Sequence, residues 1–262
     1  MHLLTRSVRF AINEGVSAPG RNGYAGNPPV SGFGRWLELV VTCRGTVDQS
    51  TGYLIDIKTV DSHVRNDAVP LFQQAVASGE DPTLTLRAVA QILATKLPVT
   101  PQSVRLRLTP YHDIEMAPSD PSYALIRQRF DFSAAHRLHS PALSDAENLK
   151  LYGKCNNPRG HGHNYIVQPV VKVRLDSHPA FSLVDLEAIT DQAVIQAFDH
   201  KHLNEDTPEF NVEKGGVLPS VENIARICFG RLGPAIAAHP SRPTLESVTV
   251  WETDRTSATY PG

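Results

Sequence analysis

Short runs of alternating apolar and polar residues occur in both halves of this chain, with helix-like patterns between them. Alternation with a period of two predicts half-buried strands, and apolar residues three and four apart predict amphipathic helices. The predicted strands include residues 36–46, 104–108, 165–173 and 248–251. Pro82 and Pro219 each stand where a proline would open a predicted helix, near its first turn. The pattern therefore predicts two strands, two helices and two strands, twice over.

The junction between the two halves is predicted at residues 117–121, Ala-Pro-Ser-Asp-Pro, which are rich in proline and turn-forming residues. This gives one unit over residues 1–118 and a second over residues 122–262. A chain of 262 residues is long enough for two such units to bury a core each.

Three histidines in the second half have the spacing of metal ligands. His161 and His163 stand two apart where the chain enters a predicted strand, so both imidazoles lie on one face. His136 ends another alternating run, residues 126–132 and beyond, and can complete the set from a neighbouring strand. Three imidazoles and a vacant position are typical of catalytic zinc; a closed structural site with Cys155 as the fourth ligand is the alternative.

The first half lacks this chemistry although its pattern is similar. When the halves are overlaid, Phe33 and Arg35 fall where His161 and His163 stand, Glu14 or Asn13 falls near His136, and Pro110 falls near Glu252. The histidines of this half are His2, His63 and His112, and they are not at the spacing of metal ligands. We therefore expect the first half to bind no catalytic metal.

Composition indicates a soluble enzyme rather than a nucleic-acid or membrane protein. The net charge is −2 and charged residues make up 20% of the chain, so no basic surface for nucleic acid or anionic lipid is expected. No apolar run approaches the roughly 20 residues that span a bilayer, and no signal-peptide pattern is present. Three cysteines do not form a disulfide framework, which favours a reducing, cytoplasmic location.

Several motifs of the second half, in order, resemble the family of 6-pyruvoyltetrahydropterin synthase and 6-carboxytetrahydropterin synthase. The resemblance extends over about residues 132–260. It rests on Phe132-Ser-Ala-Ala-His-Arg-Leu, Leu143-Ser-Asp-Ala-Glu-Asn-Leu-Lys-Leu-Tyr-Gly-Lys-Cys-Asn-Asn-Pro, Gly160-His-Gly-His-Asn-Tyr, Asp199-His-Lys-His-Leu-Asn, Pro219-Ser-Val-Glu-Asn-Ile-Ala, Glu252-Thr253 and Tyr260.

The resemblance implies the substrate 7,8-dihydroneopterin triphosphate and a Zn²⁺ cofactor on His136, His161 and His163. It implies that Cys155 is the base that removes a carbon-bound proton, with Asp199 and His200 as a proton-handling pair. Glu252 is expected to accept hydrogen bonds from the pterin edge, with Thr253 and Ser220 as further substrate-binding residues. Triphosphate then leaves by elimination, with no redox cofactor.

The implied fold is α+β: two tandem tunnelling-fold (T-fold) units, the first one degenerate. Each unit would be a four-stranded antiparallel sheet with two helices on one face. Units of this family join edge to edge into a β-barrel, which removes exposed strand edges. A homo-oligomer is therefore expected, either three tandem chains that give six units or two chains that give four. The implied partner is the pterin triphosphate, with neither nucleic acid nor membrane.

Three functions stay open at this point. A pyruvoyl-type synthase is favoured by the five residues between Cys155 and His161, because the carboxy-type enzymes often have a shorter gap. The second is a carboxy-type synthase of the deazapurine (queuosine) pathway, which uses the same substrate and metal. The third is a non-catalytic pterin-binding protein, suggested by the degenerate first half.

Overall fold

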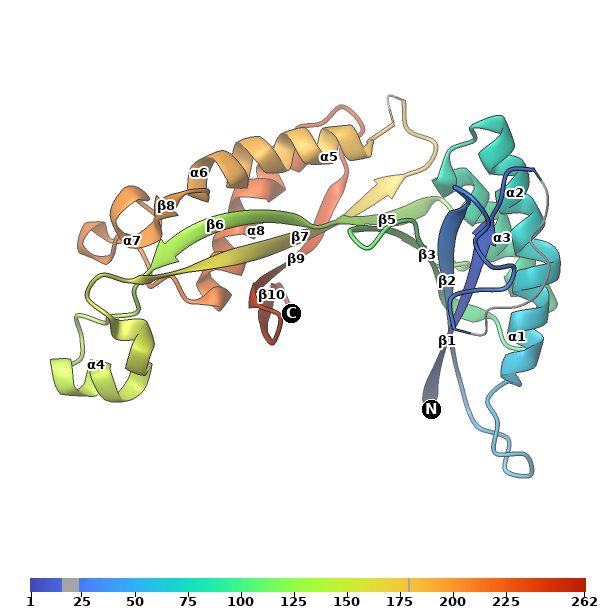
Figure 1. The fold of residues 1–262 in the computed structure, drawn as a ribbon, viewed down its shortest axis with the longest axis horizontal. Helices are drawn as coiled ribbons and strands as arrows, with labels where there is room; N and C mark the ends of the chain where they lie inside the picture. The colour runs from blue at the N-terminus through green and yellow to red at the C-terminus, as the bar shows by residue number, and fades with distance from the viewer. Residues whose placement is uncertain (16–23, 179) are drawn as a thin grey trace. The chain divides into compact units, whose positions relative to one another are not determined.

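The computed structural model describes residues 1–15, 24–178 and 180–262, which form two compact units (Figure 1). Unit 1 comprises residues 1–126 together with 174–176, and unit 2 comprises residues 127–173 and 177–262. Strand β5 (Tyr123–Gln128) includes the division between them. Within the described ranges, no helix is long and apolar enough to cross a membrane.

Unit 1 is a four-stranded antiparallel sheet whose strands pair in sequence order. They are β1 (His2–Ile12), β2 (Arg35–Gly45), β3 (Pro101–Arg107) and β4 (His112–Met116). The helices are α1 (Ile57–His63), the π-helical η1 (Val64–Ala68), α2 (Val69–Ser78) and α3 (Pro82–Lys96). Figure 1 shows these helices along one face of the sheet. The layers meet in an apolar core, where Phe10 of β1 stacks on Phe72 of α2 with ring centroids 5.7 Å apart.

Unit 2 has the same kind of sheet with a small additional strand. Its strands are β6 (Phe130–His136), β7 (His161–Arg174), β8 (Lys201–His202), β9 (Thr244–Thr253) and β10 (Thr256–Tyr260). β6, β7, β9 and β10 pair in that order and antiparallel, while β8 adds a short parallel pairing on β6.

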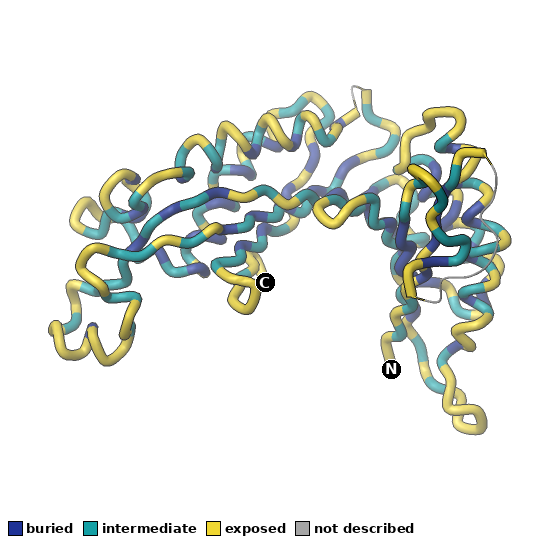
Figure 2. Tube along the Cα trace, viewed as in Figure 1, coloured by how far each residue is buried: buried dark blue, intermediate teal, exposed yellow. Residues whose placement is uncertain are grey.

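The helices of unit 2 lie between these strands in the sequence. They are α4 (Asp145–Tyr152), the 3₁₀ turn η2 (Gly153–Asn156), α5 (Leu183–Thr190), the π-helical η3 (Asp191–Ile195), α6 (Gln196–Phe198), α7 (Leu203–Asp206), the 3₁₀ turn η4 (Val212–Lys214) and α8 (Val221–Ala237). Figure 2 shows the buried residues along the strands and on the helix surfaces that face them, whereas the α4 segment is largely exposed.

The two units share an order of elements, and the predicted α+β class is confirmed. In each unit two strands are followed by a long helix with a π-helical segment, a second long helix and two further strands. The predicted helix that begins at Pro82 is also confirmed: Asp81 caps it, its carboxylate accepting the Thr83 backbone N–H at 2.7 Å.

Two local expectations need correction. The alternating run over residues 126–132 is not one strand, because Arg129 separates β5 from β6. The helix predicted at Pro219 is present but begins two residues later, because Ser220 is the N-cap and α8 starts at Val221. The Pro219 carbonyl oxygen therefore lies ahead of the helix, outside its backbone hydrogen bonds. It contacts a histidine of the site described next.

Candidate metal centre and active site

Three imidazoles and one carboxylate converge at one end of the unit 2 sheet. His136 ends β6 and pairs with His161 in the strand register, while His163 lies two residues further along β7. Glu252 comes from β9, on the other side of β7. One ligand atom from each of these four residues lies within 4.8 Å of the others.

The individual distances place the donor atoms around a common point. Nε2 of His136 lies 3.2 Å from Nε2 of His161 and 3.2 Å from Oε1 of Glu252. Nε2 of His163 lies 3.3 Å from the same carboxylate oxygen. His161 thus faces this point with Nε2, while its other ring nitrogen, Nδ1, is buried and has no hydrogen-bond partner among the described residues. Such a set of nitrogen and oxygen donors suits a divalent cation such as Zn²⁺.

A hydrogen bond outside this cluster orients its most buried member. The His136 side chain is fully buried, and its Nδ1 lies 2.7 Å from the Pro219 carbonyl oxygen. Because a carbonyl only accepts, Nδ1 donates the proton of this bond, so Nε2 is the His136 nitrogen that faces the cluster. Support of this kind is usual for histidines that bind metals.

The electrostatics of the cluster favour neutral His161 and His163 beside an ionised Glu252 carboxylate. Burial lowers the pKa of His161 and of His163; the neighbouring imidazoles lower it further, and the Glu252 carboxylate opposes this shift. The hydrogen bond from His136 lowers the pKa of Glu252. Neutral imidazole and carboxylate are the forms that bind a metal ion.

Cys155 lies in η2, and hydrogen bonds attach this turn to the strand end that carries His136. The Cys155 carbonyl accepts the Leu138 N–H at 2.9 Å. The Arg137 guanidinium donates to the backbone and side-chain oxygens of Asn156, at 3.3 and 3.1 Å. Asn204 of α7 in turn binds both the N–H and the carbonyl of Arg137, at 2.8 and 3.0 Å. The predicted base and the predicted ligand strand are thus parts of one hydrogen-bonded framework.

The Cys155 thiol itself is not among the four converging donors. It is half-buried and lies near Tyr165, whose ring is packed against those of His136 and His163, with centroids 6.0 and 5.5 Å apart. Burial raises the pKa of the Tyr165 phenol, and the charges of Glu252 and Cys155 raise it further. This arrangement leaves Cys155 beside the cluster rather than in it, unlike in a closed four-ligand site.

Asp199 and His200 form a hydrogen-bonded pair, with 2.7 Å between Oδ2 and Nδ1. The other carboxylate oxygen of Asp199 accepts the Ser133 N–H at 2.8 Å, and these two bonds lower the pKa of Asp199. His200 has φ of 55°, in the left-handed region, and its N–H donates to the Ser133 carbonyl at 2.6 Å. Its side chain is 83% exposed. Among the described residues, His200 makes no bond to the histidine cluster.

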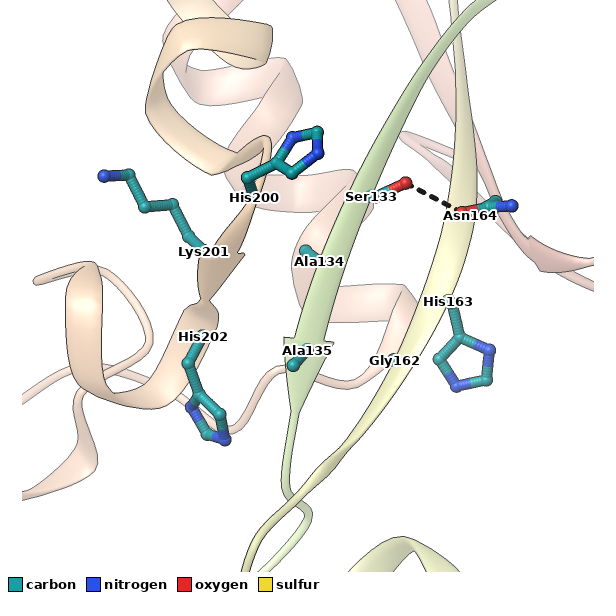
Figure 3. A pocket seen from close by; sticks show the side chains of 9 residues that line it. All are labelled: Ser133, Ala134, Ala135, Gly162, His163, Asn164, His200, Lys201 and His202. Atoms are coloured by element: carbon teal, nitrogen blue, oxygen red, sulfur yellow. Dashed lines mark hydrogen bonds between the residues drawn. The ribbon is translucent and has the colours of Figure 1, made fainter.

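The face of the sheet next to this pair is hollowed. Figure 3 shows the hollow, whose volume is about 500 Å³. Ser133 and Asn164 are hydrogen-bonded across its floor at 2.7 Å, and the His200 ring stands at its edge beside Ser133 (Figure 3). The remaining lining residues are Ala134, Ala135, Gly162, His163, Lys201 and His202.

The two remaining predicted substrate residues have structural hydrogen bonds. The Ser220 hydroxyl accepts the Asn223 N–H at 3.4 Å as the cap of α8, and the Thr253 hydroxyl accepts the Arg255 N–H at 3.2 Å. The sequence alone did not indicate that the Pro219 carbonyl and the Asn204 amide support the site. Both residues lie within the family motifs of the sequence, and this position was the only sequence signal that could have indicated their role.

Fold and site together define unit 2 as an α+β domain with a candidate divalent-metal centre at the end of its sheet. The chain belongs to the 6-pyruvoyl tetrahydropterin synthase family, whose model matches residues 125–262. The predicted family resemblance is therefore confirmed, together with a T-fold for this unit.

Individual relatives match the same half of the chain. The chain is 42% identical over 143 residues to the 6-pyruvoyl tetrahydrobiopterin synthase of Homo sapiens, which covers 53% of this chain and 92% of the relative. It is 43% identical over 142 residues to the protein of that name from Drosophila melanogaster, covering 53% of this chain and 80% of the relative. A solved structure of 6-pyruvoyl tetrahydropterin synthase from Caenorhabditis elegans is 34% identical, with a TM-score of 0.47, covering 53% of this chain and 96% of that one.

Proposed function

We propose that this protein is a zinc-dependent lyase of the 6-pyruvoyltetrahydropterin synthase type, which eliminates triphosphate from 7,8-dihydroneopterin triphosphate. The observation that carries the proposal is the convergence of His136, His161, His163 and Glu252 in a family member whose Cys155 is held beside them. The names of the related proteins support the pyruvoyl-type product over the carboxy-type product.

His136, His161 and His163 would hold the zinc ion, whose Lewis acidity would stabilise negative charge on substrate oxygens. The donor set fits the ion, because burial lowers the pKa of His161 and His163 and the hydrogen bond to Pro219 turns Nε2 of His136 toward the cluster. In the free protein Glu252 lies against these imidazoles. We propose that with substrate bound this carboxylate accepts the 2-amino and ring N–H groups of the pterin.

Cys155 is the proposed base. Its thiolate takes the carbon-bound proton next to the ring, and the electron pair left behind passes into the ring C=N bond, whose nitrogen is protonated. A second proton is then lost from the side-chain carbon beside the triphosphate-bearing carbon, a carbon–carbon double bond forms, and triphosphate departs with the C–O electrons. Asp199 holds His200 through Nδ1, so that Nε2 of this exposed imidazole is available to exchange a proton. Ser220 and Thr253 are proposed to bind substrate near the metal.

The proposed working form is a homo-oligomer. His200 is exposed and unconnected to the histidine cluster among the described residues, which supports the proposal that it serves the site of another copy. In this arrangement residues 122–262 form the catalytic unit, and residues 1–118 form a metal-free unit that completes a barrel. Native mass spectrometry tests the assembly, with three or two chains per particle expected and a fully active monomer contradicting it.

The test of function is incubation of the purified protein with 7,8-dihydroneopterin triphosphate, followed by mass analysis of the products. We expect 6-pyruvoyltetrahydropterin and inorganic triphosphate in equal amounts, and no turnover after removal of metal by a chelator. Release of acetaldehyde with 6-carboxytetrahydropterin would assign the protein to the other branch of the family. Binding of the substrate without turnover would make it a pterin-binding protein.

A further inference from the structure

Unit 1 contains a cavity of about 290 Å³ between its sheet and its helices. This volume is at the lower end of the roughly 300–1,000 Å³ usual for small-molecule sites, so it suits a compact ligand of one or two rings. The lining comes from β2, from β3 and the residues after it, and from the facing parts of α2 and α3. The side chains that matter here are Arg35, Leu37, Phe72, Val76, Leu106 and Leu108, with Glu80 just after the end of α2.

The strand register shows that this cavity is the counterpart of the metal centre of unit 2. In unit 1, Phe10 on the first strand pairs with Leu37 on the second; in unit 2, Phe132 pairs with Tyr165. Two residues before these partners stand Arg35 in one unit and His163 in the other. Arg35 therefore occupies the position of a metal-ligating histidine.

The third strand agrees with this correspondence. Glu38 pairs with Arg107 and Ile166 pairs with Trp251. One further step of the antiparallel register brings Leu37 opposite Leu108, as it brings Tyr165 opposite Glu252. The counterpart of Glu252 is thus Leu108 and not Pro110, which corrects the overlay of the two sequences by two residues.

The helix layer matches as well. Phe72 stacks on Phe10 in unit 1, and Phe198 packs on Phe132 in unit 2 with centroids 6.2 Å apart. The cavity in unit 1 therefore occupies the position of the metal centre in the fold, with the ligand chemistry replaced. Where unit 2 has imidazoles and a carboxylate, unit 1 has one guanidinium above a largely apolar wall.

Arg35 is available for a ligand. The arginines on the opposite face of the same sheet are paired, since Arg9 and Arg107 both bind the buried carboxylate of Glu38. Neither the Arg35 guanidinium nor the Glu80 carboxylate has a hydrogen bond or ion pair to any described residue. A guanidinium offers two parallel N–H groups to a carboxylate, so Arg35 favours an anionic group at the mouth.

We propose that unit 1 carries a second, metal-free binding site in this cavity, which takes a small aromatic carboxylate. The ring lies against Leu37, Leu106 and Phe72, and the carboxylate binds Arg35. Glu80 favours a ligand that also carries a hydroxyl or amino donor. The proposal does not depend on the reaction assigned to unit 2.

The test uses isothermal titration calorimetry of the full chain with 6-hydroxy-2-naphthoate as the probe. We expect saturable binding at about one site per chain, with a Kd below about 1 mM. Arg35→Met should weaken binding about 10-fold or more, the scale expected when a charge-assisted hydrogen bond is lost. Arg44→Met is the matched control, because Arg44 is an exposed arginine of the same strand outside the cavity, and it should bind as the unaltered chain does.

Two further variants and one further probe locate the site. Val76→Phe should fill the cavity and abolish binding, with a thermal melt to show that the variant is folded. His161→Ala should bind the probe normally, since His161 belongs to unit 2 and does not line the cavity. 2-Naphthol, which lacks the carboxylate, should bind weakly and be indifferent to Arg35→Met.

Three results would overturn the proposal. The first is absence of saturable binding in the full chain at millimolar probe. The second is equal affinity in Arg35→Met and the unaltered chain. The third is loss of binding in His161→Ala with retention in Arg35→Met, which would place the carboxylate on the metal of unit 2.

Discussion

Unit 1 and unit 2 share an order of strands and helices but differ at the strand ends where chemistry is possible. Unit 2 has His136, His161, His163 and Glu252 there, within 4.8 Å of one another. The corresponding end of unit 1 has Arg35, Leu37 and Leu108 around a cavity. The core pattern that specifies the fold is therefore separable from the few positions that specify a site. The residues at those positions differ between the units while the arrangement of the sheet is kept.

The largest expected difference between the units concerns metal. His161→Ala should reduce bound zinc from about one ion per chain to near none and abolish turnover, because two imidazoles are fewer than the three ligands of catalytic zinc sites. Elemental analysis of the purified variants measures this. His63→Ala is the control in unit 1, where the imidazole only pairs with Asp67 at 2.9 Å, and it should leave metal and turnover unchanged. Two zinc ions in the unaltered chain would contradict a metal-free unit 1.

The second prediction concerns the thiols of the two units. Cys155→Ala should retain zinc and lose turnover by about 10²-fold or more, the usual scale for removal of a general base. Cys43→Ala in unit 1 is the control: burial raises the pKa of that thiol, which keeps it protonated and unreactive. Steady-state rates and zinc content are measured together. If Cys155→Ala lost its zinc, the thiol would be a ligand and the site closed.

The third prediction concerns the framework around Cys155. Asn204→Ala removes two hydrogen bonds to the Arg137 backbone, between the His136 strand end and the η2 turn. We expect kcat to fall by up to about 30-fold with KM little changed and most zinc retained, at about 1 kcal/mol for each of the two lost bonds.

Two further variants test whether the effect of Asn204→Ala comes from the lost hydrogen bonds. Asn66→Ala removes one exposed hydrogen bond to Ser62 in unit 1, at 3.1 Å, and should have no effect on kcat. Asn204→Asp keeps the acceptor oxygen for the Arg137 N–H and should recover part of the rate. An unchanged kcat in Asn204→Ala would show that the turn is held by Leu138 and Arg137 alone.

The smallest expected effect is on pH-dependent stability of the metal-free protein. Burial lowers the pKa of His161 and His163 in unit 2 and of His112 in unit 1. A histidine whose pKa is lower in the folded than in the unfolded state binds its proton more readily when the protein is unfolded. Protonation therefore favours the unfolded state, and stability falls as the pH drops below the ordinary histidine pKa of about 6.5. Tm should therefore drop between about pH 7.5 and pH 5.5.

A comparison of variants assigns that drop to one unit. His163→Asn should reduce the pH-dependent loss of Tm by a few degrees. His112→Asn should reduce it less, because His112 is shifted by burial without a neighbouring imidazole. Equal effects in both variants would mean that mutual repulsion within the cluster contributes nothing.

A large part of the site was predictable because its signals are local. His161 and His163 share a strand face whatever the rest of the fold does, and the motifs around His136 and Cys155 indicated the family. The helix that begins at Pro82 was predictable for the same reason, since its cap and first turn are adjacent in the sequence. The break at Arg129 was missed because alternation does not reveal where a strand leaves its partner.

By itself, the sequence determined the strands, the long helices and the half of the chain that can hold a metal, because period and residue type are properties of neighbouring positions. Only the tertiary structure decided that Glu252 lies against His136 and His163, that the Pro219 carbonyl orients His136, and that Leu108 rather than Pro110 stands opposite Leu37. These contacts join segments distant in the chain. Their register follows from how whole strands and helices pack, which no local pattern contains.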